Sequence, residues 1–575
     1  MTNPLDSSRP CSGILRDASK RYKFTTYSED WTDVSKQPTK VISSAFFIFF
    51  AVLGPAITFA AYLDRETRSE IGAIEVLLSS GICSVFMSLF AGQPLTIVGV
   101  TGPISILTVI IYKLSKNWGI NFLPFYAWAQ IWASLMHVIL SIGNFCYYVK
   151  YITSFSCEIF GVLVAAIFIY TGIEGIILAF NKDKEGNISD SNSSTNTSVS
   201  TTLSPALFQL IIALGTAYTS VILSHAHKWT VGNTVLRNFI SDNCSTISML
   251  LWSSISYDCL SSAPELGPIP SLYLPDRFVT TSGRAWVVNF TDISVSGIFT
   301  AIFPGAIITI LYYFDHNISS KMARASEFSL QKSDAYHLDF FWLGLGLLMT
   351  GILGLPPTNG MIPHSPLHTQ SLMHKTRVCD KDGKPTDTFE NGYVVEQRLS
   401  NLIQGVLCIL VCFWPFSRAL TQIPNALLYG LFIFLGLSSL EGNGFVDRIN
   451  YCLTEEKLRE MHSSSKCKWM NHSIPFNKIK YFTLIQFALF ALIFVITFTP
   501  AAVIFPVLIA ALVYIRAVIL PKKYFFGNIS NIDGVSMVID LLDPFDDSTS
   551  SNVDEISVNS RPLGIYDSDS SSVQL

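Results

Sequence analysis

Long apolar stretches separated by polar and charged segments run along most of this chain. Most of these stretches are long enough to cross a bilayer as a helix. The stretches cover residues 41–63, 71–90, 93–113, 122–149, 157–180, 203–223, 239–260, 295–314, 337–355, 354–374, 402–416, 425–440, 482–498 and 501–520. The pattern therefore predicts an all-α polytopic membrane protein with fourteen spans.

The third stretch is a poor continuous helix. Its residues 95–98 are mostly β-branched and extended in character, and Gly99 and Gly102 loosen the backbone that follows. Pro103 suits the first turn of a helix, where its missing N–H costs nothing. We therefore predict a short extended piece followed by a half-length helix over residues 103–113. An ordinary span kinked by glycine and proline remains the alternative.

The tenth stretch breaks the helical pattern in the same way. Four prolines and two glycines fall within residues 354–368, which cannot form a standard spanning helix. We predict extended backbone and then a half-helix that starts near Pro363 and runs to about residue 374. The two broken segments are third of seven in each half of the chain, which indicates a 7+7 inverted repeat with a midplane binding site. Two helix N-termini would face each other there, which suits a small anion or a neutral hydrogen-bonding solute.

Composition narrows the class of protein further. The chain of 575 residues is 50% hydrophobic and 14% charged, with a mean hydropathy of +0.41, which is typical of a membrane protein. The eleven cysteines show no paired spacing, and we predict neither a metal site nor a cofactor. His364 and His368 would share a helical face, but no carboxylate or thiol joins them in that segment. The sequence shows no evident nucleophile–base pair, so we do not predict an enzyme. We also attach no nucleic-acid partner to the basic loops.

Charged loops and glycosylation sequons orient the chain. The polar segment 1–40 carries several lysines and arginines, and basic residues collect in alternate loops, so we expect a cytoplasmic N-terminus. Sequons at Asn187, Asn192, Asn196 and Asn289 fall in loops on the opposite side and are candidate glycosylation sites. Residues 521–575 are rich in acidic residues and predict a disordered cytoplasmic tail.

Several motifs resemble the bicarbonate and anion-exchanger family of transporters. The motifs are Gly92-Gln93-Pro94-Leu95-Thr96-Ile97-Val98-Gly99-Val100-Thr101-Gly102-Pro103, Cys157-Glu158-Ile159-Phe160, Phe239-Ile240-Ser241-Asp242 and His337-Leu338-Asp339. The tenth segment, Gly354-Leu355-Pro356-Pro357-Thr358-Asn359-Gly360 through Pro363-His364-Ser365-Pro366-Leu367-His368-Thr369, looks most like the borate-transporter branch of plants and fungi.

The resemblance implies two membrane domains that move against each other like an elevator. A core would comprise residues 41–149 and 292–417, with spans 1–4 and 8–11. A gate would comprise residues 150–291 and 418–520, through which two copies of the chain would dimerise. The chain lacks the large N-terminal domain of animal anion exchangers and has His364 where they place an arginine, which weakens the case for chloride/bicarbonate exchange.

The resemblance and the broken segments together give the candidate substrate-binding residues. The first half-helix terminus contributes Thr101, Gly102, Pro103, Ile104 and Ser105, and the second contributes Asn359, Gly360, Met361, Ile362, Pro363 and His364. Asp315, which closes the predicted eighth span, matches the family's acid there and is the candidate for proton coupling. The alternatives are a boundary acid that pairs with Lys321 and, for Asn359, a simple turn residue.

These residues favour a borate or boric acid exporter in the plasma membrane or the vacuolar membrane. Asn359 offers both a donor and an acceptor, which matches a polyhydroxylated solute. A bicarbonate or other inorganic-anion transporter of the same fold is the alternative. A passive channel and a polytopic membrane enzyme are the competing classes from outside this fold.

Overall fold

The fold was analysed in a computed structural model of the chain. The structure describes residues 9–151, 153–190, 205–231, 233–263, 269–272, 274–275, 277–324, 328–362, 364–379, 385–441, 443–456, 475–499 and 505–520. Within these ranges, eight helices are long and apolar enough to cross a membrane, or nine if one bent pair counts as a single span. The chain is thus a mostly helical membrane protein. The predicted count of fourteen stays a prediction, and the acidic segment 521–575 lies outside the described residues.

The first half of the chain is helical with one short strand. Its elements are α1 (Ser12–Arg21), α2 (Phe24–Thr32), η2 (Asp33–Lys36), α3 (Pro38–Glu66), α4 (Ala73–Phe90), β1 (Val98–Gly99), α5 (Gly102–Asn117), α6 (Phe122–Ile142), η3 (Phe145–Tyr151), α7 (Ser154–Asp190), α8 (Pro205–Ser224), η4 (Ala226–Lys228), α9 (Thr234–Asp242) and α10 (Cys244–Ser262).

The second half repeats the helix, strand, helix order and adds a hairpin. Its elements are α11 (Val295–Thr300), α12 (Ile302–Ala323), α13 (Tyr336–Leu353), β2 (Asn359–Gly360), α14 (His364–Ser371), β3 (Met373–Cys379), β4 (Pro385–Val394), α15 (Leu399–Leu410), α16 (Phe416–Leu420), α17 (Asn425–Leu440), α18 (Gly444–Leu453), α20 (Phe476–Thr497), α21 (Phe505–Tyr514) and η9 (Ile515–Ile519).

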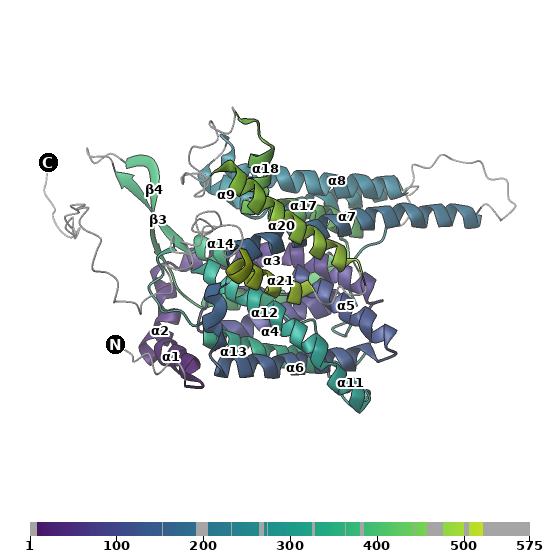
Figure 1. Ribbon diagram of the computed structural model, residues 1–575. Coiled ribbons are helices and arrows are strands. Elements are labelled where there is room, and N and C mark those ends of the chain that lie inside the picture. Colours follow the sequence, from purple (N-terminus) through teal and green to yellow (C-terminus); the bar gives the residue numbers. More distant parts are fainter. Residues whose placement is uncertain are drawn as a thin grey trace, which may run out of the picture.

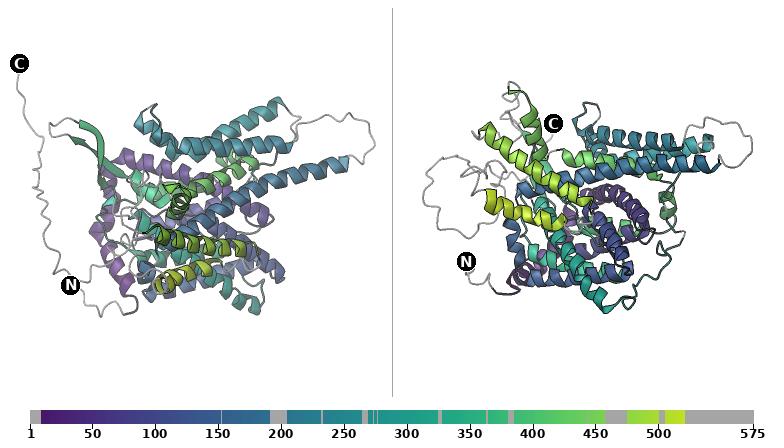
Figure 2. Two further views of the ribbon diagram at one scale, coloured as in Figure 1. Left: turned by 45° about the horizontal axis from the view of Figure 1, so that its top comes forward. Right: turned by 45° about the vertical axis from the view of Figure 1, so that its right-hand side comes forward.

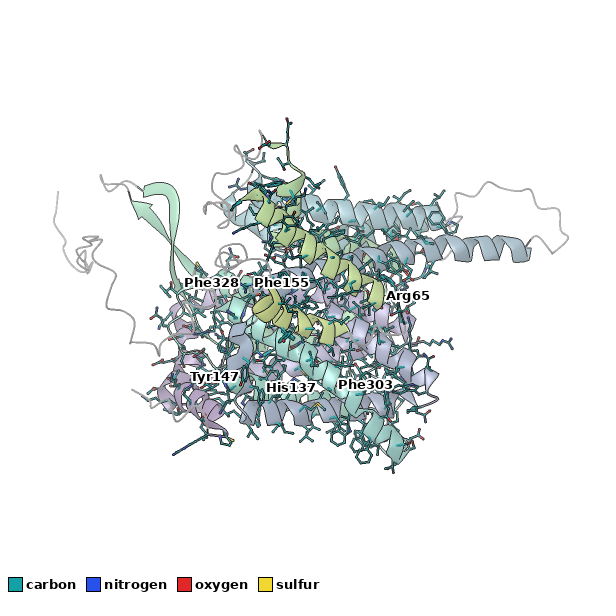
Figure 3. The ribbon with its side chains drawn as sticks, in the orientation of Figure 1. Arg65, His137, Tyr147, Phe155, Phe303 and Phe328 are labelled. Carbon is teal, nitrogen blue, oxygen red and sulfur yellow. The ribbon has the colours of Figure 1, made fainter. Side chains whose placement is uncertain are left out.

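The helices pack in two groups (Figure 1). One group stacks α6 on α12 and α13 and α4 on α15, and the other stacks α17 on α7 and α8. Glycines allow close approach in the first group: a Cβ on Gly305 would lie 2.8 Å from the Ala129 carbonyl oxygen, and one on Gly344 would lie 2.7 Å from the His137 Cβ. The His137 ring, labelled in Figure 3, stacks on Phe340 with ring centroids 4.3 Å apart.

The structure corrects three predicted boundaries. Helix α12 does not end at Asp315 but continues to Ala323, which places Asp315 more than two turns inside it. Helix α7 continues to Asp190, where a loop from residue 181 was expected, so Asn187 lies in a helix, while Asn192 and Asn196 lie outside the described residues. Part of the expected charged loop after α14 is the antiparallel hairpin of β3 and β4, which projects from the helices (Figures 1 and 2).

The N-terminal segment is a folded strap, formed by α1 and α2, on the first group of helices. The Asp30 carboxylate accepts hydrogen bonds from Arg398 Nε at 2.8 Å and from Lys332 Nζ at 2.6 Å. The Asp17 carboxylate accepts the backbone N–H of His337 at 3.0 Å, and burial raises the pKa of this carboxyl to about 6. The Gly13 N–H donates to Asn144 Oδ1 at 2.9 Å. The strap therefore contacts the segments after α6 and α12, the start of α13 and the residue before α15.

Candidate functional site

The two broken segments meet as a short antiparallel pair of strands. Val98 of β1 pairs with Gly360 of β2, and Gly99 pairs with Asn359. The Met361 N–H also donates to the Ile97 carbonyl at 2.8 Å. Extended backbone within a membrane protein needs such internal partners because lipid offers none. Each strand therefore satisfies the polar backbone of the other, and the predicted extended pieces become one structure.

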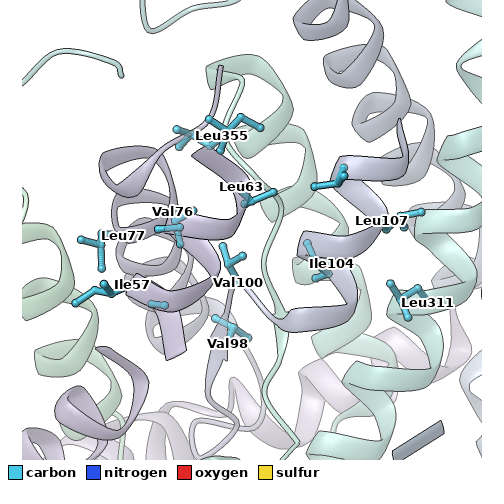
Figure 4. Packing of buried hydrophobic residues seen from close by; sticks show 14 of the residues in the cluster. Ile57, Leu63, Val76, Leu77, Val98, Val100, Ile104, Leu107, Leu311 and Leu355 are labelled. Atoms are coloured by element: carbon cyan, nitrogen blue, oxygen red, sulfur yellow. The ribbon is translucent and has the colours of Figure 1, made fainter. Parts of the chain in front are cut away.

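A helix begins directly after each strand. Thr101, with φ −107° and ψ 163°, is the last extended residue before α5, and no side chain caps this helix. Helix α14 begins at His364. The first turn of each helix leaves N–H groups without intrahelical partners, although Pro103 contributes none. Figure 4 shows Val98 and Val100 in the extended segment and Ile104 in the first turn of α5. The predicted half-helix starts, at Pro103 and near Pro363, lie within one residue of these bounds, while Pro363 itself lies outside the described residues.

Buried serines hold the strand crossing in place. From α4, Ser84 Oγ donates to the Val98 carbonyl at 2.9 Å, and Ser80 Oγ accepts the Val100 N–H at 3.2 Å. From α14, Ser365 Oγ accepts the Ile97 N–H at 3.0 Å. The sequence reasoning missed these residues. Their signal was present, because Ser79, Ser80 and Ser84 are hydroxyl residues within a mostly apolar span.

Helix α12 packs directly against β2 and α14. A Cβ on Gly360 would lie 2.8 Å from the Ser319 Cβ and 3.1 Å from the His316 Cα, and Ser319 Oγ is 2.7 Å from Ser365 Oγ. Asp315 precedes Ser319 by four residues, so the two side chains share one face of α12. Asp315 is 2% exposed and lies inside α12, which continues to Ala323. This buried position within the helix argues against the boundary-acid alternative.

Several buried polar atoms around the crossing have no hydrogen-bond partner among the described residues. These atoms are Thr101 Oγ1, Tyr312 Oη, Asp315 Oδ1, both ring nitrogens of His316, and Asn359 Nδ2. The Asn359 Oδ1 atom accepts the Gly360 N–H at 2.8 Å, so this side chain keeps two free donors. Buried polar groups without partners are costly and therefore need an explanation. A polar solute bound between the helix starts would supply partners to both donors and acceptors.

His364 is anchored to α3 one turn before an internal proline. Pro55 lies inside α3 and has no N–H, so the Ala51 carbonyl loses its helical donor. His364 Nε2 lies 3.1 Å from this carbonyl oxygen, and because a carbonyl only accepts, Nε2 carries the hydrogen. The contact ties the start of α14 to the middle of α3. We interpret His364 as a positioning residue.

We expect His364→Leu to lower the thermal unfolding midpoint of the detergent-solubilised protein, because the Ala51 carbonyl would remain buried without a donor. An unsatisfied group of this kind costs about 1–3 kcal/mol. His364→Gln, whose amide can still donate, is expected to stay close to the unmodified protein. Equal losses in both variants would contradict the positioning role.

His368 is fully engaged in the fold. Its Nδ1 lies 3.0 Å from the Leu95 carbonyl, and its Nε2 lies 2.6 Å from Ser400 Oγ. The ring therefore bridges the segment before β1 to the start of α15. This arrangement gives His368 a structural role that the sequence did not predict.

The structure brings some of the predicted residues together at the strand crossing and leaves others apart from it. Thr101 to Ser105 and Asn359 to Ile362 lie at the crossing or at the helix starts, and α12 brings Asp315 to the same region. Ser105 Oγ bonds within α5, to the Thr101 carbonyl at 3.0 Å. Asn289 lies apart from the crossing, exposed before α11, and its Oδ1 accepts the Thr291 hydroxyl at 2.7 Å.

Several known proteins are similar to this chain in sequence or in fold. The family described as "HCO3- transporter integral membrane domain" matches residues 9–203 and 181–534. Boron transporter 1 of Saccharomyces cerevisiae is 31% identical, over 86% of this chain and 81% of its own. Boron transporter 4 of Arabidopsis thaliana is 28% identical, over 92% of this chain and 88% of its own.

One solved structure extends the likeness to the fold. The overall structure of SLC26A9 has a TM-score of 0.54 and 12% sequence identity, over 84% of this chain and 66% of that chain. At this identity the comparison concerns the fold alone. The family match covers nearly all of the described residues, and it confirms the resemblance drawn from the sequence motifs. The chain is a member of the HCO3- transporter integral membrane domain family.

Proposed function

We propose that the protein is a secondary active transporter that exports borate or boric acid across the plasma membrane. One observation carries the proposal: two helix starts meet at a strand crossing, where Thr101, Asp315 and Asn359 hold buried polar atoms without partners. Two relatives named as boron transporters support the choice of substrate. Transport would follow from an elevator movement of residues 41–149 and 292–417 against residues 150–291 and 418–520, with two copies paired through the latter.

The chemistry of the site suits boron species. Tetrahydroxyborate is a small anion whose hydroxyl groups both donate and accept hydrogen bonds, and neutral boric acid shares this property. The free N–H groups of α5 and α14 would donate to its oxygens, with help from the positive helix ends. The Asp315 carboxylate would accept from a hydroxyl, and Asn359 Nδ2 would donate. Asp315 is also the proposed site of proton coupling.

We expect cells that lack their own exporter to accumulate less boron when they carry this protein and are challenged with boric acid. Asp315→Ala and Asn359→Ala, compared at equal surface expression, should both abolish the decrease because each removes a polar partner of the solute. The measurement is total cell boron. Unchanged boron with well-expressed unmodified protein would contradict borate export.

A bicarbonate or other inorganic-anion transporter is the second candidate function. The description of the family favours it, and helix starts bind small anions without regard to their central atom. The same cells separate the candidates, because a bicarbonate transporter would change the rate of intracellular pH recovery and leave boron unchanged.

The proposed orientation has both termini in the cytoplasm. It rests on the excess of lysine and arginine in alternate loops, and it places Asn187, Asn192, Asn196 and Asn289 outside as candidate glycosylation sites. Exposure of Asn289 supports its use.

A further inference from the structure

A cavity of about 480 Å³ opens between the C-terminal end of α3 and the helices α7, α8 and α17. We call it the vestibule, and its polar lining includes Asp64, Arg65, Glu66, Gln209 and Asn425. Arg65, one of the lining residues, is labelled in Figure 3. The vestibule lies at the end of α3 that the proposed topology places outside. It lies between the two packing groups of helices, because α3 packs mainly on α4 and α15 of the first group, whereas α7, α8 and α17 form the other.

Three phenylalanine rings pack together beside the vestibule, and one of them lines it. Phe59 comes from α3, Phe168 from α7 and Phe432 from α17, and we call them the aromatic triad. The three pairs of ring centroids lie 5.6, 5.9 and 5.8 Å apart, so every ring contacts both others. All three side chains are buried, and Phe432 also lines the vestibule. Aromatic contacts carry no hydrogen bond that would have to break when the rings separate.

The start of α5 lies directly behind the triad. A Cβ on Gly102 would come within 2.1 Å of the Phe168 Cζ, so only glycine allows the ring to approach this closely. A small void on this side is lined by the triad together with Tyr62, Gly102, Ser105, Ile106 and Thr171. Tyr62, Thr171 and Phe432 line both the void and the vestibule. The shared residues place the void beside the vestibule, and the void, with the triad in its wall, adjoins the helix terminus proposed to bind substrate.

We infer that the aromatic triad is the barrier between the vestibule and the substrate site. An apolar constriction excludes a hydrated ion until its walls separate. Because Phe59 belongs to one packing group and Phe168 and Phe432 to the other, a displacement of α3 against α7 and α17 opens the barrier. The identity of the solute that passes the barrier rests on the proposed function, but the existence of the barrier does not.

The barrier can be tested by the access of a charged, membrane-impermeant methanethiosulfonate reagent to Ser105→Cys in intact cells. We expect Ser105→Cys alone to react slowly, and the added change Phe168→Ala to raise the labelling rate at least tenfold. Phe155→Ala is the matched control, because Phe155 is also a buried ring of α7 but contacts Phe482 instead of the triad. The labelling of the unmodified protein is subtracted to account for native cysteines.

Gln209→Cys in the vestibule wall sets the side of access. We expect Gln209→Cys to be labelled rapidly both alone and together with Phe168→Ala. If Gln209→Cys is labelled only from the cytoplasmic side, the experiment is repeated on inverted vesicles. Phe432→Ala replaces Phe168→Ala if the latter fails to reach the cell surface. Equal labelling rates of Ser105→Cys with the intact triad and with one ring replaced by alanine would contradict the proposal that the triad is a barrier.

Labelling requires no substrate, so the two proposals fail separately. Ring-dependent labelling in a protein that does not change cell boron would leave the barrier supported and the borate proposal contradicted. If Ser105→Cys is labelled equally with and without the Phe168 ring in a protein that lowers cell boron, the barrier is contradicted and the borate proposal is supported.

Discussion

Asp315→Asn is expected to abolish transport while leaving the protein folded. The substitution keeps the shape of the side chain and removes only its charge. The carboxylate is buried in α12, and its Oδ1 has no hydrogen-bond partner among the described residues. A charge inside a membrane protein is costly, and its default explanation is function. We expect the initial rate of boron efflux to fall at least about tenfold, which corresponds to about 1.4 kcal/mol of barrier height.

The stability of the Asp315→Asn variant separates a functional role from a structural one. If Asp315 serves the substrate or a proton, removal of its unpaired charge should leave the thermal unfolding midpoint unchanged or raise it. Asp258→Asn, at an exposed position of α10, is the matched control and should change neither quantity. A large fall in the midpoint together with lost efflux would instead make Asp315 a structural residue.

Gly360→Ala is expected to damage transport far more than Gly99→Ala, although both glycines lie in the two-stranded pair. A Cβ on Gly360 would lie 3.1 Å from the His316 Cα and 2.8 Å from the Ser319 Cβ, so α12 itself would have to shift. A Cβ on Gly99 would meet Met361 Sδ at 2.8 Å, and this flexible side chain can rotate away. Overpacking of the first kind costs about 1–3 kcal/mol.

The two glycine variants are compared by boron efflux and by thermal midpoint at equal expression. We expect Gly360→Ala to lower both and Gly99→Ala to stay near the unmodified protein. If the two variants behave alike, the contact between β2 and α12 does not control the geometry of the site.

Local signals in the sequence predicted the helix starts well. Glycine loosens and proline restricts the backbone over only a few residues, so Gly102 and Pro103 were sufficient to place the start of α5. The pairing of Val98 with Gly360 joins segments more than 250 residues apart. No local pattern specifies such a register, although the repeat of two broken segments indicated that they belong together.

The missed features depend on burial by distant elements. The run Asp315-His316-Asn317 is polar enough to resemble the end of a span, yet α12 buries all three residues within the fold. Ser80 and Ser84 look like ordinary residues of a membrane span in the sequence. Their role is visible only in the fold, where the segment around β1 supplies their hydrogen-bond partners. The strap was missed for the same reason, because Asp30 is an ordinary surface acid until Arg398 lies beside it.

The strap offers a position from which to observe movement. Its bonds from Asp17, Asp30 and Gly13 all go to one packing group of helices, so α1 and α2 must travel with that group. Helix α18 packs on α7 and α20, which belong with the other group. If the two groups move against each other as proposed, the distance between a donor fluorophore on the strap and an acceptor on α18 changes with each transport cycle. The energy transfer between them would report the stroke of a single molecule without any need to label the substrate.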